Sequence, residues 1–455
     1  MSRVVPSKLT SYSALPQGVS NKQLEISYAS ILPSNSSSSA QFAPDGTNRM
    51  LFRVPAFANC FLDNSRSSLS FTFKVNNAAA DTTGNGLLLN PYLGTTSIFK
   101  RMILKSAQGL VIEDIVDLHI LNKILLTMQP VSETRISEGI LTGDHYMETE
   151  VSAAQKTLLN TAQIDGVRYQ YFFNIGILSR HLKQFIPLHS LNTGTGQAFS
   201  IELWLNDNYN VLTKLGSGTA DSAKSYNISD VKYNMTLLKA DESIISRFNN
   251  LANESSELVI PFTTYRTYNN SLNGSKATLQ VTEACSDLRR VHSVILSTSS
   301  ETQPVDTKYS TNMSFIGGCD HSSTSVTSYQ LQVGTKFIYN EPIVSAYDNN
   351  DLLQQVQYAS YSKLPISATR LKKDDTTPLY QTEDFTLTSC FTFDDPNSYT
   401  NGISLGSLPL VLKLELSASA SSALCQTFSE LGFDLVIKDG TMMVRDRKDV
   451  GDFGY

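Results

Sequence analysis

The stretch Leu69-Ser70-Phe71-Thr72-Phe73-Lys74-Val75 decides the fold, because apolar and polar residues alternate in it without a break. A period of two places every second side chain on one face, which is the pattern of a half-buried β-strand. Upstream, the apolar residues of 51–55 predict a short strand. Downstream, 98–106 and 110–115 flank the turn residues Ala107-Gln108-Gly109 and predict a β-hairpin. We therefore expect a chain built mainly from antiparallel strands.

Predicted strands continue to the end of the chain, and predicted helices are few. Further strands are predicted over 168–178, 198–205, 228–238, 257–265, 288–297, 327–339, 385–393, 408–417 and 432–444. Apolar residues repeat at helical spacing over 117–128, which predicts a helix with Asp117 as its cap. Two more helices are predicted over 240–251 and 348–358. Loops rich in Gly, Ser, Asn and Pro separate these segments, as is typical of an all-β sandwich or barrel.

The two halves of the chain present similar elements in the same order. A strand, a turn, a strand and an acidic residue occur over 104–113 and again over 331–341, each shortly before a predicted helix. Each half also ends with a pair of predicted strands. The pair is 199–205 and 231–238 in the first half, and 410–416 and 433–437 in the second. These parallels predict two β units of about 200 residues each, joined near 249–257. The alternative is one multi-sheet fold in which the order coincides by chance.

Composition excludes several classes of protein. Charged residues are 17% of the 455 residues, against roughly 25% in an average soluble domain, and Ser, Thr and Asn replace them. Lys and Arg total 36 and Asp and Glu total 42, so the net charge of −6 excludes a strongly basic nucleic-acid binder. No run of about 18 apolar residues could form a membrane helix. Residues 1–24 lack the apolar segment of a secretory signal.

The sequence carries no catalytic or metal-binding motif, so we expect no catalytic, cofactor-binding or metal-ligating residues and no enzyme activity. The closest groupings are Cys319-Asp320-His321, the pair His181 and His189, and Asp394-Asp395. Each lacks the partners that a nucleophile, a zinc ion or a calcium ion needs, and we interpret them as loop and packing residues. The five cysteines are far apart and predict reduced, mostly buried thiols; they are Cys60, Cys285, Cys319, Cys390 and Cys425.

One cluster of aromatic residues allows two interpretations. Tyr169, Tyr171, Phe172 and Phe173 follow one another within a predicted strand. Strand alternation places half of such side chains in the interior, and we favour that interpretation. The alternative is a platform on which bases or sugars stack.

Two motifs resemble a known family. Phe52-Arg53-Val54-Pro55, followed by the stretch from Phe61-Leu62-Asp63-Asn64-Ser65-Arg66 to Phe71, is similar to the first strands of double jelly-roll major capsid proteins from polinton-like viruses, adintoviruses and virophages. Residues 226–231 with 237–248 resemble the end of the first jelly roll in that group. The resemblance is clearest over 52–251, and in the second half it depends mainly on the order of elements.

The resemblance implies an all-β fold of two tandem, upright, eight-stranded jelly rolls with short helices in the connecting loops. We expect residues 1–24 to be an N-terminal extension, 25–250 the first jelly roll and 251–455 the second. The implied function is that of a major capsid protein, whose homotrimers form pseudo-hexagonal capsomers that tile an icosahedral shell around double-stranded DNA. The implied partners are neighbouring capsomers, penton proteins and minor cement proteins, and an inner membrane is common beneath such shells. The implied location is the virion, after synthesis in the host cytoplasm or nucleus.

The N-terminal residues refine this expectation. Among residues 1–24, the only cations are Arg3, Lys8 and Lys22, so we expect no direct, sequence-specific binding of nucleic acid. We expect this segment to thread beneath neighbouring capsomers and to become ordered on assembly. Two other functions compete with the capsid protein. A carbohydrate-binding β-sandwich needs a shallow site lined by aromatic, Asp or Asn residues, and a β-sandwich hydrolase needs convergent carboxylates or a nucleophile pair.

Overall fold

A computed structural model describes most of the β-rich part of the chain. The residues described are 24–35, 40–76, 87–90, 93–128, 133–144, 153–182, 184–191, 196–214, 225–246, 258–282, 284–297, 326–338, 341–344, 387–391, 402–406, 408–438 and 440–446.

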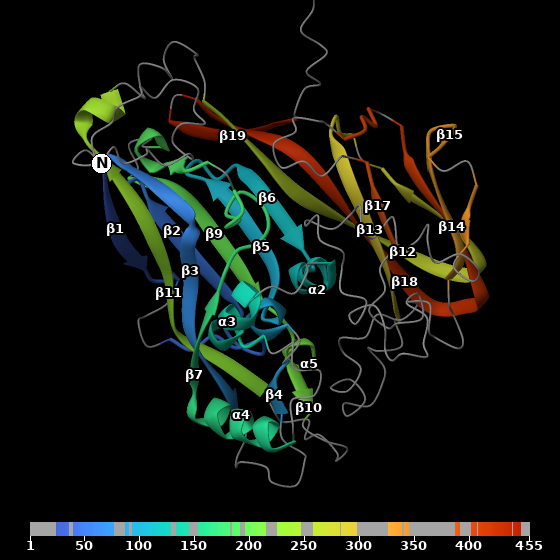
Figure 1. Ribbon diagram of the computed structural model, residues 1–455, viewed down its shortest axis with the longest axis horizontal. Helices are drawn as coiled ribbons and strands as arrows, with labels where there is room; N and C mark the ends of the chain where they lie inside the picture. The colour runs from blue at the N-terminus through green and yellow to red at the C-terminus, as the bar shows by residue number, and fades with distance from the viewer. Residues whose placement is uncertain are drawn as a thin grey trace, which may run out of the picture.

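The first half of the described chain forms two antiparallel sheets that face each other (Figure 1). In one sheet the strand order is β1 (Leu24–Ile31), β11 (Ser225–Ala240), β3 (Cys60–Asn76) and β7 (Val167–Tyr171), and β8 (Ile186–Pro187) also pairs with β3. In the other sheet the order is β2 (Arg49–Pro55), β9 (Gln197–Leu205), β5 (Phe99–Ser106) and β6 (Val111–Val116). A small third sheet pairs β4 (Leu87–Leu89) with β10 (Leu212–Lys214).

The alternation within 69–75 sets which face of β3 is buried. Its apolar side chains have an exposed fraction of 0%, namely Leu69, Phe71, Phe73 and Val75. Phe71 meets Phe99 of the facing sheet edge-on, with the ring centroids 6.2 Å apart. Burial of one such side chain contributes about 1.5–3 kcal/mol. A slip of one residue would turn the whole set toward solvent, so this face fixes the register of the strand.

The predicted hairpin and the first predicted helix are confirmed. β5 and β6 pair antiparallel around Gly109, whose φ of 86° suits a glycine. The helix α2 (Leu118–Met128) follows, and the backbone carbonyl of Asp117 accepts hydrogen bonds from Ile120 and Leu121 at its start. The side chain of Asp117 is directed elsewhere, toward Gln426 of the second half.

The loops of the first half contain helices that the sequence pattern did not predict. These are α3 (Glu133–Thr142), α4 (Ala153–Asp165) and α5 (Asn208–Val211), with the 3₁₀ turns η2 (Gly94–Ser97) and η3 (Leu188–Leu191). Of the helix predicted over 240–251, residues 242–246 are helical, Ala240 instead ends β11, Asp241 belongs to neither element, and 247–251 lie outside the described residues. The helix predicted over 348–358 also lies outside them.

The second half forms one large antiparallel sheet. Its order is β15 (Lys336–Phe337), β14 (Val326–Val333), β18 (Leu410–Lys438), β13 (Leu288–Ser297) and β17 (Leu387–Cys390). In addition, β12 (Leu258–Val281) and β19 (Thr441–Asp446) pair with β18, and β16 (Ile343–Val344) pairs with β14. β12 and β18 have 24 and 29 residues and pair along most of their length, whereas the sequence predicted a shorter strand over 257–265 in β12 and two separate strands that start at 408 and 432 in β18.

Three predicted strands end early or divide at a turn. The strand predicted over 168–178 ends at Tyr171, for a reason described below. The strands predicted over 327–339 and 432–444 are each two strands, because Gly334 and Gly440 have φ of 57° and 77° and place a turn between them.

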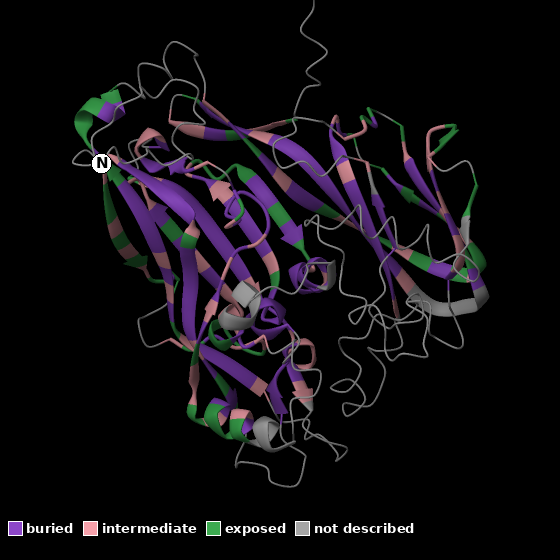
Figure 2. Cartoon of the chain, in the orientation of Figure 1, coloured by how far each residue is buried: buried purple, intermediate pink, exposed green. Residues whose placement is uncertain are grey.

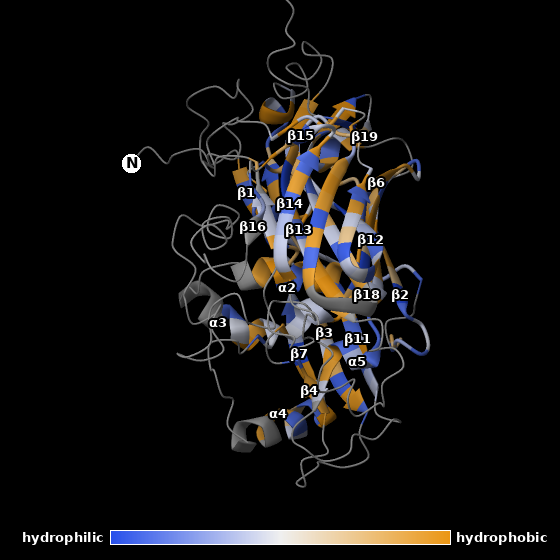
Figure 3. Cartoon of the chain, turned by 90° about the vertical axis from the view of Figure 1, so that its right-hand side faces the viewer, coloured by the Kyte–Doolittle hydropathy of each residue, from blue (hydrophilic) through white to orange (hydrophobic). Residues whose placement is uncertain are grey.

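Buried residues run along the strands of both halves (Figure 2). In Figure 3 several strands are banded between hydrophobic and hydrophilic along their length, as an alternating pattern requires. One cluster of buried hydrophobic residues extends through both halves, and a smaller cluster lies beside it. In the described part of the chain, no helix is long and apolar enough to cross a membrane.

Candidate functional site

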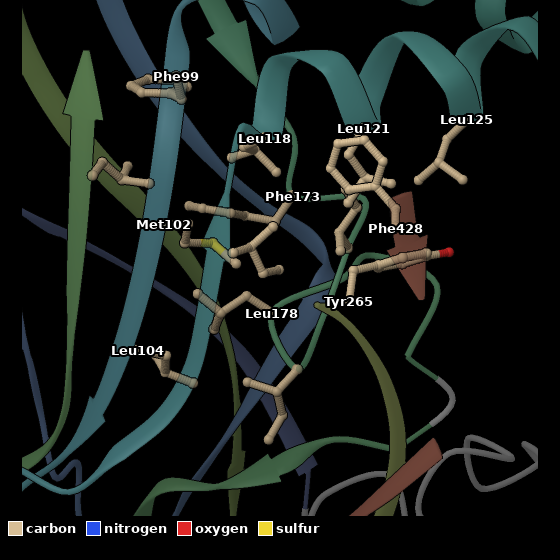
Figure 4. Packing of buried hydrophobic residues seen from close by; sticks show 14 of the residues in the cluster. Phe99, Met102, Leu104, Leu118, Leu121, Leu125, Phe173, Leu178, Tyr265 and Phe428 are labelled. Atoms are coloured by element: carbon tan, nitrogen blue, oxygen red, sulfur yellow. The ribbon is translucent and has the colours of Figure 1, made fainter. Parts of the chain in front are cut away.

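The two halves meet across an apolar contact that we call the junction, formed by β6 and α2 on one side and by β12 and β18 on the other. Figure 4 shows Leu121 and Leu125 of α2 on the side of Phe428 of β18 and Tyr265 of β12, while Leu118 lies toward Phe173 of the first half. Leu118 and Leu121 are 1% and 0% exposed, and Phe428 is 0% exposed. Apolar surface removed from water at this contact therefore holds the halves together.

Two polar contacts also cross the junction. The Thr267 hydroxyl donates a hydrogen bond to the backbone carbonyl of Val116, at 3.1 Å. The side-chain amide of Gln426 donates to the Asp117 carboxylate, at 2.6 Å. Burial raises the pKa of Asp117, and the hydrogen bond from Gln426 offsets part of that effect. The junction thus pairs its polar groups where the apolar contact ends.

A buried carboxyl group lies within the junction. Glu113 of β6 is 3% exposed, and its Oε2 accepts a hydrogen bond from the backbone amide of Ile177, at 3.0 Å. Burial raises the pKa of Glu113 to about 7, while hydrogen bonds from the Thr264 side chain of β12 and from the Ile177 amide act in the opposite direction. Among the described residues, no charged group contributes to this shift. The carboxyl group is therefore neutral in the fold below neutral pH.

The irregular segment after β7 packs against the Glu113 carboxyl group. Gly176 has a φ of 75°, and a Cβ atom at this position would collide with the Glu113 carboxylate. A continuous strand over 168–178 could not turn this way and present the Ile177 amide to the carboxylate. The close approach explains why the predicted strand ends early.

A buried ion pair lies next to the junction in the second sheet. Arg290 Nη1 is 3.1 Å from each carboxylate oxygen of Glu430, and the two side chains are only 6% and 2% exposed. The Tyr265 hydroxyl donates to the same carboxylate at 3.1 Å. His292 lies beside them, and burial lowers its pKa to about 4. Tyr265 therefore connects this charged cluster with the apolar contact of α2.

The structure separates most of the candidate residues named from the sequence. Cys60, Cys285 and Cys425 are buried thiols, as predicted. His189 Nδ1 lies 3.4 Å from the Cys60 carbonyl oxygen, and His181 is exposed. Cys319-Asp320-His321, Asp394-Asp395 and the side chain of Cys390 lie outside the described residues. Within the described ranges, no three His, Cys, Asp or Glu side chains are grouped to hold a metal ion.

Three of the four clustered aromatic residues are part of the core, and the fourth, Phe172, is half-buried with the Arg180 guanidinium 5.5 Å from its ring centroid. Tyr169, Tyr171 and Phe173 are 3%, 2% and 3% exposed, and their rings contact other core aromatics. The interior interpretation is therefore confirmed, and these three rings offer no open platform for a base or a sugar.

The role of Glu113 was missed in the sequence, although a signal was present. Glu113 and Asp114 are adjacent within a predicted strand, so one of the two acids must face inward. Asp114 faces outward and pairs with Arg101, whereas Glu113 enters the junction. Sequence alone gives no partner for the inward acid, because Thr264 and Ile177 come from distant parts of the chain.

Comparisons with known proteins give matches in structure only. No protein-family model matches the chain, and no curated protein matches it by sequence. PBCV-1 VP54, fitted into a reconstruction of the virophage Sputnik, matches with a TM-score of 0.58 and 11% identity, over 95% of this chain and 99% of that chain. The Faustovirus major capsid protein matches with a TM-score of 0.58 and 9% identity, over 93% and 92%. The mavirus major capsid protein matches with a TM-score of 0.54 and 11% identity, over 96% and 93%.

These identities are too low to transfer the role of any residue. The matches nevertheless run through nearly the whole of both chains in each comparison, including both halves of this one. They agree with the predominance of antiparallel strands and with the resemblance that 52–71 shows in sequence. The chain therefore has the all-β, double jelly-roll fold of virophage and large DNA virus major capsid proteins.

Proposed function

We propose that this chain is a major capsid protein whose function is assembly rather than catalysis. The observation that supports this most directly is the structural match over 95% of this chain and 99% of PBCV-1 VP54. A match confined to one jelly roll would also suit a binding module, because single β-sandwiches serve many functions. The tandem arrangement over the full length favours the capsid protein over the carbohydrate-binding alternative.

In this proposal three chains form a pseudo-hexagonal trimer, and trimers tile an icosahedral shell around double-stranded DNA in the virion. Residues 1–24 are the N-terminal extension, 25–250 the first jelly roll and 251–455 the second. Each chain supplies two similar units, so three chains give a capsomer with six-fold pseudo-symmetry. Neighbouring capsomers are then the principal partners, with penton and minor cement proteins at vertices and seams.

The same proposal assigns no direct, sequence-specific nucleic-acid contact to this chain. The net charge of −6 and the three cations within residues 1–24 support that view. Synthesis in the host cytoplasm or nucleus and an inner membrane beneath the shell belong to the proposal as features of the family.

The test is the mass and shape of the purified full-length protein. Light scattering should give three times the chain mass of 50.1 kDa, and negative-stain micrographs should show three-lobed, hexagon-edged particles or shells. A folded chain that remains monomeric at every concentration tested would refute the proposal. A glycan array serves as the control for the alternative function, because specific glycan binding by a monomer would support the carbohydrate-binding module instead.

A further inference from the structure

In the described part of the chain, no strand pairs with the outer edge of β1. Among the described residues it pairs with β11 alone, from Leu24 opposite Ala240 to Ile31 opposite Tyr233. In Figure 1 it forms the outer rim of that sheet. Its sequence, LEISYASI, contains one charge and no proline. An edge strand of this length, with little charge and no proline, is a template on which another strand can pair.

The outer face of β1 also exposes apolar side chains. Ile26 and Tyr28 are 48% and 78% exposed. Ile26 stands opposite Leu238 of β11, which belongs to the smaller buried cluster together with Phe61 and Phe185. The exposed residues therefore extend an existing apolar surface toward the outer edge of β1, where a further strand would cover them.

We propose that β1 is a contact between two copies of this chain, in which two β1 strands pair antiparallel about a two-fold axis centred on Ser27. An axis perpendicular to the sheet keeps each face on its own side, so opposed residues must differ by an even number. Centring on Ser27 places Ile26 of each copy opposite Tyr28 of the other. Glu25 then stands opposite Ala29, so the only charges in the strand do not oppose each other.

Other registers combine these features less well. An axis through Tyr28 places Ile26 opposite Ser30 and so separates the two apolar residues of each strand. An axis through Ile26 limits the overlap within the described strand to 24–28. The axis through Ser27 pairs seven residues, from 24 to 30, and clusters all four apolar side chains on the outer face.

This contact goes beyond the proposed capsomer. It is isologous, so it joins copies two at a time and cannot close a three-fold ring. Between trimers the β1–β1 contact would connect one capsomer to the next. Each trimer would make this contact up to three times, so several weak contacts would together hold neighbouring capsomers. The inference does not depend on the proposed function, since a chain that forms no trimer would still pair through β1.

A cysteine at the two-fold axis tests the register. In the full-length protein, Ser27→Cys would place two thiols on opposed residues with Cα atoms about 4.5–5.5 Å apart, within the range of a disulfide. Ala29→Cys is the matched control, because Ala29 lies on the same face and is also partly buried, but its copies would be separated by about 13 Å along the strands. Wild-type protein controls for the native cysteines.

After mild oxidation, Ser27→Cys should give a reducible dimer of twice 50.1 kDa, at least tenfold more abundant than with Ala29→Cys or wild type. Adding Tyr28→Lys to Ser27→Cys should lower the dimer at least tenfold while circular dichroism stays unchanged. Equal cross-linking of Ser27→Cys and Ala29→Cys would overturn the proposal. Protection of the Ser27→Cys thiol from maleimide without dimer formation would also overturn it and would favour residues 1–23 as the segment that covers the edge.

Discussion

Replacing Glu113 with Gln should remove a pH dependence from the stability of the fold. The pKa of Glu113 is about 7 in the fold, against a reference value of 4.5. Below pH 4.5 both the folded and the unfolded chain hold this proton, and its contribution to stability is complete. As the pH rises toward 7 the unfolded chain loses the proton first, so the free energy of unfolding falls by about 1.4 kcal/mol per pH unit. The total loss is about 3 kcal/mol, and it levels off above pH 7.

Gln is neutral at every pH and has the same shape. Its oxygen can accept the hydrogen bond from the Ile177 amide that Oε2 of Glu113 accepts. We therefore expect Glu113→Gln to match the wild type within about 1 kcal/mol at pH 4.5 and to exceed it by up to about 3 kcal/mol at pH 8.

Urea denaturation at a series of pH values from 4.5 to 8, at one protein concentration, measures this difference. Asp114→Asn is the matched control, because it removes the neighbouring acid, which is partly exposed and pairs with Arg101 at 2.5 Å. An exposed ion pair is worth about 0–1 kcal/mol, so the control should differ from wild type by a small offset with no gain at high pH. Parallel pH curves for wild type and Glu113→Gln would refute the reasoning.

Three other substitutions test the packing, each by chemical denaturation with circular dichroism. Phe71→Ala should lower the free energy of unfolding by about 3–5 kcal/mol because it opens a cavity in the core. The control Lys74→Ala, at an exposed position of the same strand, should change it by no more than about 0.5 kcal/mol, and similar losses for both would contradict the assigned face of β3. Glu430→Gln should lower the free energy of unfolding by about 3–5 kcal/mol because it leaves the buried Arg290 guanidinium without its counter-charge. An unchanged denaturation midpoint would show that the pair is not buried. Gly176→Ala should destabilise the fold by more than 1 kcal/mol, and a Glu113→Ala background should recover part of that loss; strictly additive effects would contradict the contact.

Much of the fold followed from the period-two pattern, since that pattern reflects which side chains leave water. It identified β3, the β5–β6 hairpin and most strands of the second half, and helical spacing identified α2. It failed for the long pair β12 and β18. Residues 268–277 of β12 contain Asn, Ser and Gly and are largely exposed, so they resemble a loop in sequence. They become strand because pairing with β18 satisfies their backbone.

The candidate site was harder to predict, because its partners come from distant segments. Glu113 carries the same carboxyl group as Asp114, and the tertiary packing of β6 against β12 and against the segment around Gly176 decides which of the two is buried. α3 and α4 were missed for a related reason. Their sequences are largely polar, and what stabilises them is contact with β7, β3 and β4 rather than a strong helical pattern of their own.

The leucines that α2 contributes to the junction affect how the protein unfolds on heating and whether one half can be expressed alone. Because these leucines belong to a core that runs through both jelly rolls, neither half has a closed surface of its own. A gene fragment that ends at residue 250 would carry α2 with its partners Tyr265 and Phe428 removed, and the uncovered leucines would favour aggregation. Calorimetry of the intact chain should then show one cooperative transition. The two jelly rolls would thus unfold as a single thermodynamic unit. Separating them into independent domains would require new side chains on α2.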